Sequence, residues 1–305
     1  MLKEAVSYNL TKEEALCFVE KVLDIPTPEN LIHANKEYFI REFVRQVNLN
    51  IPFTNVPFIT NKGLTTLSLN ECKEAMFTRQ GGNCVIISSF VKAVIELLGI
   101  DCYTIGGSLY RWKNPVFEDH LAVIVQNVTF PGSLHLLDLG TRYFFEPVPL
   151  DFDRVSPVYQ CRHFPYRFFH VSAGVVQLCR KYKLSKKGPN HLRLIYVEND
   201  EWWEVLTTFR TLQPKCLLNG LELNRLIAED RNLTSLSGSD ILLFGYPNGL
   251  SVDITTKRCL TMSENGLTEM VKMTSPRNVI ETVQKYFPQY SYLQVEAVVN
   301  HFSSR

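Results

Sequence analysis

Cys84 is the side chain in this sequence best placed for nucleophilic chemistry. It follows Arg79-Gln80-Gly81-Gly82-Asn83 and begins an apolar segment that predicts a helix from Cys84 to Leu98. A thiol at a helix N-terminus faces the positive end of the helix dipole and unpaired backbone N–H groups, which favour the thiolate and can hold an oxyanion. The two glycines remove side chains beside the sulfur, so that a substrate can approach and the backbone can bend sharply. The alternative is a helix-capping turn with an incidental cysteine.

His120 and Asp138 could supply the general base and the orienting group that a thiol nucleophile needs. His120 opens an apolar run that continues to Val125, and Asp138 closes the apolar segment Leu134–Leu137. If these segments are adjacent antiparallel strands, His120 and Asp138 lie side by side and Cys84 reaches them from a helical layer. Taken singly, the histidine could be a satisfied core residue and the aspartate a turn residue. Together, the three residues predict a catalytic triad with an ionised sulfur that water can reach.

The first third of the chain is typical of the helical layer that would carry Cys84. Thr11-x-x-Glu14 is a capping-box pattern ahead of apolar residues at helical spacing, and Pro26 and Pro28 end that helix. Further helices are expected from about Asn35 to Val47, from Asn70-Glu71 to Gly81-Gly82, and from Cys84 to Leu98.

The middle third changes to short β-branched and aromatic runs separated by Gly, Pro, Asn and Asp, which favours an antiparallel barrel or sandwich. The last third mixes strands with a helix that Ser275 caps and that continues to Phe287. The strands are expected at Cys102–Tyr110, Leu121–Val125, Leu134–Leu137, Val175–Tyr182, Leu192–Val197 and Trp202–Leu206, and then at Ile241–Phe244 and Leu250–Ile254 around the turn Pro247-Asn248-Gly249.

Composition is that of a globular chain with no strong electrostatic preference. The 305 residues suffice for two or three domains, and 32 Lys and Arg against 31 Asp and Glu give a net charge of +1. We therefore expect no nucleic acid or membrane partner. No secretory or transit pattern and no run of ~18 apolar residues occurs, which favours a cytoplasmic location. The eight cysteines are scattered, so we expect thiols and no metal site.

The residues around the predicted triad resemble the arylamine N-acetyltransferase family. The order Cys, His, Asp is that of the family, and the likeness extends over nearly the whole chain. The matching elements are Arg79-x-Gly81-Gly82-x-Cys84, His120-x-x-x-x-Val125, Leu137-Asp138-x-Gly140, Ile51-Pro52-Phe53, Pro147-Val148-Pro149-Leu150 and Pro247-Asn248-Gly249.

This resemblance implies an α+β fold of three parts with a Cys-His-Asp core like that of the cysteine proteases. The N-terminal helical bundle, residues 1–100, would carry the nucleophile. The central antiparallel β-barrel, residues 101–210, would carry the histidine and the aspartate, and residues 211–305 would form an α/β lid.

The resemblance also implies the activity, which is acetyl transfer by a ping-pong mechanism. Acetyl-CoA, as a co-substrate, would acetylate Cys84, and an arylamine, hydrazine or related small amine would accept the acetyl group. His120 would move protons and Asp138 would fix its tautomer. Residues that line the slot for CoA in the family would correspond to Val116, Phe117, Gly140 and Thr141. We expect no metal and a monomer.

The sequence departs from the family pattern beside the triad, which leaves two alternatives open. Asn83 stands in place of a bulky residue, Val85-Ile86-Ile87-Ser88 in place of a more polar stretch, and Arg142 where a glycine is usual. The chain could therefore be a protein that binds CoA or an amine and has lost efficient transfer. It could also be a thiol hydrolase or a transglutaminase-like enzyme, since these use the same order of residues.

Overall fold

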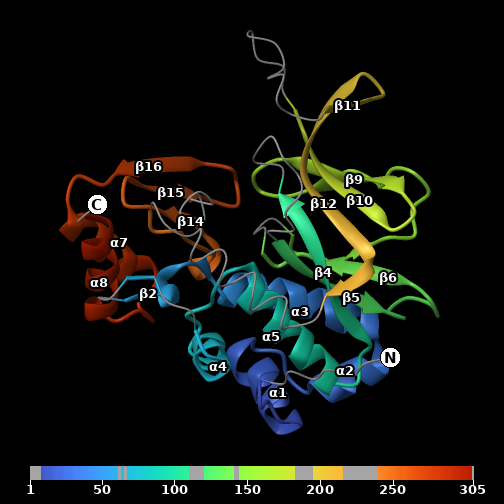
Figure 1. Ribbon diagram of the computed structural model, residues 1–305, viewed down its shortest axis with the longest axis horizontal. Helices are drawn as coiled ribbons and strands as arrows, with labels where there is room; N and C mark the ends of the chain where they lie inside the picture. Colours follow the sequence, from blue (N-terminus) through green and yellow to red (C-terminus); the bar gives the residue numbers. More distant parts are fainter. Residues whose placement is uncertain are drawn as a thin grey trace.

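A computed structural model of the chain describes residues 8–60, 63–64, 67–109, 120–140, 144–182, 195–215 and 240–303. It confirms the predicted α+β class: a group of helices lies between a curled antiparallel sheet and a smaller sheet flanked by two helices (Figure 1). The division into three domains stays a prediction.

Two of the N-terminal helices begin at caps that the sequence signals, whereas the helix Pro28–Ala34 has no side-chain cap and was not expected. Thr11 and Glu14 form the predicted capping box, and the Asn35 side chain accepts from the Tyr38 N–H. A capping box that we did not predict, from Ser68 to Glu71, starts the next long helix, which ends at Phe77 rather than at Gly81. The elements are α1 (Lys12–Cys17), the π-helical η1 (Phe18–Val22), α2 (Pro28–Ala34), α3 (Lys36–Asn50), α4 (Leu69–Phe77) and α5 (Cys84–Leu97).

The curled sheet is antiparallel throughout, in the order β7-β6-β5-β4-β12-β10-β9-β8, with β11 on β12. Within the described residues its ends do not meet, so the sheet is a half-barrel rather than a closed barrel. We did not predict β9, and β12 is longer than expected. The strands are β4 (Cys102–Leu109), β5 (His120–Gln126), β6 (Leu134–Leu137), β7 (Val148–Pro149), β8 (Tyr159–Gln160), β9 (Pro165–Ser172), β10 (Val175–Lys181), β11 (Ile195–Glu198) and β12 (Glu201–Lys215).

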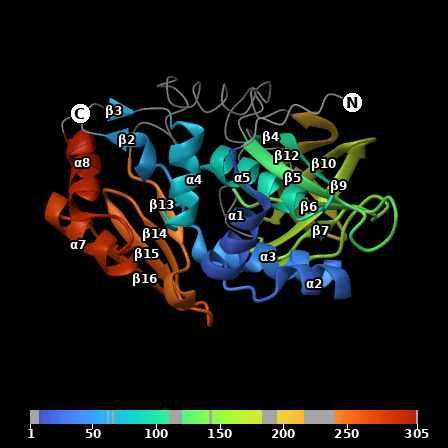
Figure 2. The ribbon, with the colours of Figure 1, turned by 90° about the horizontal axis from the view of Figure 1, so that it is seen from below.

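The smaller sheet joins a segment of the first third of the chain to the last third, because β1 pairs with β13. Figure 2 shows this sheet with α7 and α8 at one end of the molecule and the curled sheet at the other. Its strands are β1 (Phe53–Thr54), β13 (Leu243–Gly245), β14 (Ser251–Ile254), β15 (Arg258–Met262) and β16 (Thr268–Lys272), and the flanking helices are α7 (Pro276–Tyr286) and α8 (Tyr292–Ser303). A separate short hairpin pairs β2 (Ile59–Thr60) with β3 (Gly63–Leu64). The 3-10 turns are η2 (Val56–Phe58) and η3 (Pro247–Gly249).

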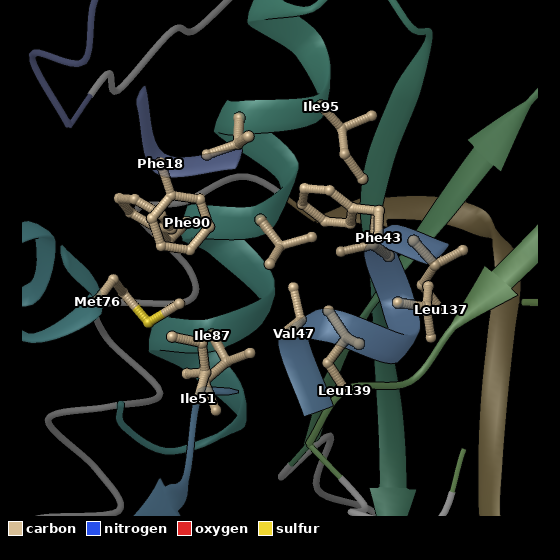
Figure 3. Close-up of a cluster of buried hydrophobic side chains, with 14 of the residues drawn as sticks. Phe18, Phe43, Val47, Ile51, Met76, Ile87, Phe90, Ile95, Leu137 and Leu139 are labelled. Carbon is tan, nitrogen blue, oxygen red and sulfur yellow. The ribbon is translucent and has the colours of Figure 1, made fainter. Parts of the chain in front are cut away.

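A large apolar cluster fixes α5 in the middle of the molecule (Figure 3). Ile87 and Phe90 of α5 pack with Phe18, Phe43 and other buried side chains of the helices. Burial of each such side chain stabilises the fold by roughly 1.5–3 kcal/mol. The helix that begins with Cys84 is therefore rigidly held. None of the described helices combines the length and the apolar character needed to cross a bilayer.

Candidate active site

Cys84, His120 and Asp138 come together although they lie on three different elements. His120 Nε2 is 2.7 Å from Asp138 Oδ1, and the same imidazole hydrogen-bonds to the Cys84 side chain. Because Asp138 occupies Nε2, Nδ1 is the nitrogen that faces the sulfur. The arrangement can deprotonate the thiol, hold the imidazole in one tautomer and return a proton to a leaving group.

Strand register explains how His120 meets Asp138. β5 pairs with β6 from Val123↔Leu137 onward, so Asp138, the residue after β6, extends toward the start of β5 where His120 lies. On the other side, Gly107 of β4 is opposite His120. A Cβ at Gly107 would lie 3.2 Å from His120 Cδ2, so the glycine gives the imidazole room.

The glycines before Cys84 let the backbone bend sharply, as predicted, whereas their role in substrate approach stays a prediction. Gly81 has a φ of +69°, and a Cβ there would lie 1.9 Å from the Pro52 carbonyl oxygen. A Cβ at Gly82 would lie 2.9 Å from Ile86 Cβ. The two glycines therefore let the loop pass between its neighbours and aim Cys84 at His120.

Asn83, one of the departures from the family pattern, is the N-cap of α5. Its Oδ1 accepts from the N–H groups of Val85 (3.0 Å) and Ile86 (3.1 Å). Such a cap stabilises a helix by about 0.5–2 kcal/mol. It also occupies two of the N–H groups that we expected to be available for an oxyanion.

The turn between α7 and α8 holds the loop before Cys84, a contact that the sequence analysis missed. Tyr290 Oη donates to the Gln80 carbonyl at 2.5 Å, and Gln289 Nε2 donates to the Arg79 carbonyl at 3.0 Å. The Tyr290 side chain also hydrogen-bonds to Thr54, whose N–H donates to the Gly82 carbonyl. Tyr290 and Gln80 are 210 positions apart, and no local pattern signals such a pair.

Its hydrogen bond to the His120 imidazole distinguishes Cys84 from the buried Cys72 and the half-buried Cys102. Burial by itself lowers the pKa of His120, but the Asp138 carboxylate outweighs it and, with Cys84, holds the pKa of His120 well above 6.5. In contrast, burial raises the pKa of Cys72 and of Cys102 to about 12. The seven cysteines of the described residues are all free thiols.

The triad is buried, which overturns the expectation of a sulfur that water can reach. Cys84, His120 and Asp138 are 2%, 1% and 2% exposed. Gly140 is one cause: a Cβ at this position would lie 2.4 Å from Cys84 Cβ and 2.8 Å from His120 Cε1. Cys84 also belongs to the apolar cluster around α5. A substrate can reach the sulfur only if the groups that cover it move.

Gly140 is the one residue of the predicted CoA slot that the structure describes, and it lies against Cys84 and His120. Val116, Phe117 and Thr141, and the departure at Arg142, lie outside the described residues. Within the described ranges, no group of three or more His, Cys, Asp and Glu side chains could hold a metal ion.

Solved structures of arylamine N-acetyltransferases share this fold. The enzyme from Mycobacterium abscessus superposes with a TM-score of 0.71 over 100% of both chains at 15% sequence identity. The enzyme from Salmonella typhimurium superposes with a TM-score of 0.69 over 94% of this chain and 98% of its own chain, at 16% sequence identity. The enzyme from Mycobacterium marinum, solved in complex with CoA, superposes with a TM-score of 0.68 over 93% of this chain and 98% of its own chain, at 15% sequence identity.

These structures define the class of fold: the chain has the arylamine N-acetyltransferase fold over nearly its whole length. The likeness in structure agrees with the resemblance in motifs from Arg79 to Gly140. No family model and no curated protein matches the chain by sequence.

Proposed function

We propose that this chain is a divergent member of the arylamine N-acetyltransferase family, which transfers an acetyl group from acetyl-CoA to a small amine through Cys84. The observation that carries the proposal is His120 bridging Cys84 and Asp138 within this fold. Structural relatives at 15–16% identity support the class of reaction, and one of them is a complex with CoA.

In the first half-reaction, the Cys84 sulfur attacks the thioester carbonyl of acetyl-CoA. A new carbon–sulfur bond to Cys84 forms, and the bond from the acetyl carbon to the CoA sulfur breaks. The leaving thiolate takes the proton that protonated His120 holds. The raised pKa of His120 favours the protonated imidazole that this step requires.

In the second half-reaction, the amine attacks the acetyl group on Cys84. The bond to the Cys84 sulfur breaks, and neutral His120 takes a proton from the amine nitrogen. This restores the sulfur and the protonated imidazole. Asp138 stays ionised throughout and stabilises the imidazolium, as in other triads.

The acceptor belongs to the proposal, as do a cytoplasmic location and a monomeric state. We propose an arylamine, hydrazine or related small amine, since these are the acceptors that the family resemblance implies. A substrate must displace the groups that cover Cys84, so the accessibility of the site in solution is part of the test.

The decisive experiment is intact-mass measurement after incubation with acetyl-CoA in the absence of amine. The wild-type chain should gain the mass of one acetyl group, and an added arylamine or hydrazine should remove it. Cys84→Ser should gain nothing under these conditions, because a serine hydroxyl beside the imidazole is a far weaker nucleophile than the thiol. Cys72→Ala is the matched control, because it removes another buried helix thiol and should leave acetylation intact.

The other outcomes distinguish the alternatives. An adduct that decays at the same rate with and without amine would favour a thiol hydrolase. Stabilisation of the chain by CoA without any adduct on Cys84 would favour a binding protein and overturn the proposal.

A further inference from the structure

We propose that Ser88 is a positioning residue that sets the alignment of Cys84 with His120. This inference rests on the proposed function. Ser88 Oγ donates to the main-chain carbonyl of Leu121 at 2.8 Å, and the Ser88 side chain is fully buried. Ser88 lies one helical turn after Cys84, and Leu121 directly follows His120. The bond therefore joins the two elements of the site beside their reacting groups.

The helix geometry places Ser88 on the same side of α5 as Cys84. Residues four apart in an α-helix lie on one face, one above the other. The face of α5 that presents the sulfur to His120 therefore also presents the Ser88 hydroxyl to β5. A shift of this turn of α5 along β5 would move both groups together.

The start of β5 needs such a bond because its pairing with β6 begins later. The β5–β6 register covers Val123 to Gln126, whereas β4 pairs with β5 back to His120. The first residues of β5 therefore pair with β4 on one side, and the Ser88 hydroxyl of α5 donates a hydrogen bond to the carbonyl of Leu121. Packing of α5 against β5 is apolar and has no preferred direction, whereas a hydrogen bond has one.

The next residue, Ser89, is a matched control in the same helix. It is also buried, but its Oγ donates to the Val85 carbonyl and contacts Tyr8 Oη at 2.5 Å. These partners lie within α5 and in the N-terminal segment, not in β5. Ser89→Ala therefore also removes a buried hydroxyl from α5 but leaves the link from Ser88 to Leu121 in place.

The test compares Ser88→Ala with Ser89→Ala by the pH dependence of Cys84 alkylation with iodoacetamide, followed by peptide mass mapping. We expect Ser88→Ala to slow alkylation near neutral pH by about 10-fold and to move the profile to higher pH, because small misplacements at such sites cost one or two orders of magnitude. With acetyl-CoA and an amine, kcat should fall by a similar factor while KM changes little. Ser89→Ala should keep the wild-type profile within about 2-fold.

Two results would overturn the inference: a wild-type profile in Ser88→Ala, or the same change in both variants, which would show a general effect of a lost buried hydroxyl. Alkylation needs no acetyl-CoA, so the readout survives if the proposed function fails. If iodoacetamide does not reach the buried sulfur, the pKa of His120 is measured instead by NMR titration of wild type and both variants. We expect a lower His120 pKa in Ser88→Ala alone, and an unchanged His120 pKa in Ser88→Ala would overturn the inference. Thermal unfolding of all three proteins verifies that each is folded.

Discussion

Cys72 and Cys84 are equally buried helix cysteines with opposite chemical environments. Cys72 lies inside α4 and is 1% exposed, and Cys84 begins α5 and is 2% exposed. Loss of solvation, with the nearby Glu71 charge, raises the pKa of Cys72 to about 12. Cys84 has the His120 imidazole, backed by the Asp138 carboxylate, as its hydrogen-bond partner.

The hydrogen-bond partners of a buried thiol, and not its burial alone, decide whether it can react as a thiolate. Removal from water disfavours a thiolate, so a cysteine surrounded by apolar groups stays protonated and inert. A cation held within hydrogen-bond reach offsets that penalty. The predictions below test this difference, beginning with the change that should have the largest effect.

Asp138→Asn should bring the environment of Cys84 closest to that of Cys72. Without the carboxylate, only burial and Cys84 act on His120, so the pKa of the imidazole should fall and acetyl transfer should drop about 10³–10⁴-fold. Steady-state kinetics and NMR titration of His120 measure the two effects. Asp151→Asn, an exposed carboxyl on the same half of the chain, is the control. Transfer within about tenfold of wild type would contradict the role of Asp138.

Iodoacetamide should discriminate directly between the two thiols. At neutral pH we expect Cys84 to react at least about 10²-fold faster than Cys72, because alkylation requires the thiolate. The matched burial of the two side chains removes exposure as an explanation. Peptide mass mapping over a time course gives both rates in one sample. Equal rates would show that the imidazole does not activate Cys84.

Gly140→Ala should disturb Cys84 without removing any partner. The new methyl group would overlap Cys84 Cβ and His120 Cε1, so we expect transfer to fall about 10²-fold and stability to fall by about 1–3 kcal/mol. Gly132→Ala separates the two effects: its φ of +88° makes alanine strained, but no atom lies within 4 Å of the new Cβ. If both variants lose activity alike, close packing at Gly140 is not the reason.

The ion pair of the site should appear in the pH dependence of stability. The pKa of His120 is raised on folding, so protonated His120 contributes stability that is fully present below about pH 6.5 and is lost as pH rises through the higher pKa of the folded state. The free energy of unfolding of wild type should exceed that of His120→Asn most at about pH 6 and least in alkali. Urea unfolding over this range measures it. A constant difference would contradict the raised pKa.

Much of the secondary structure could be predicted because its signals are local. The Thr11–Glu14 capping box, the apolar periodicity of α5 and the β6 segment Leu134–Leu137 lie within a few residues of the features that they specify. The missed elements also had local signals that we did not use: Asn265-Gly266 turns between β15 and β16, and Ser291 Oγ accepts from the Gln294 N–H at the start of α8. β16 is exposed along its whole length, so no burial pattern marks it.

The convergence of the candidate site depended on more than local signals. Residue types and order indicated Cys84, His120 and Asp138, and the structure places them together. Three contacts that support the site were not predicted. They are the hydrogen bond from Tyr290 to the Gln80 carbonyl, the hydrogen bond from Ser88 to the Leu121 carbonyl, and the close contact of Gly140 with Cys84. Each joins segments that are distant in the chain.

The side chains that could react were predictable from the amino-acid order alone, because capping, periodicity and turn chemistry act over a few residues. The burial of Cys84 and the contact of Tyr290, between α7 and α8, with the loop before the nucleophile emerged only from the folded structure. The physical reason is that burial and long-range hydrogen bonds depend on which surfaces pack together, and the packing of distant segments has no signature within either segment.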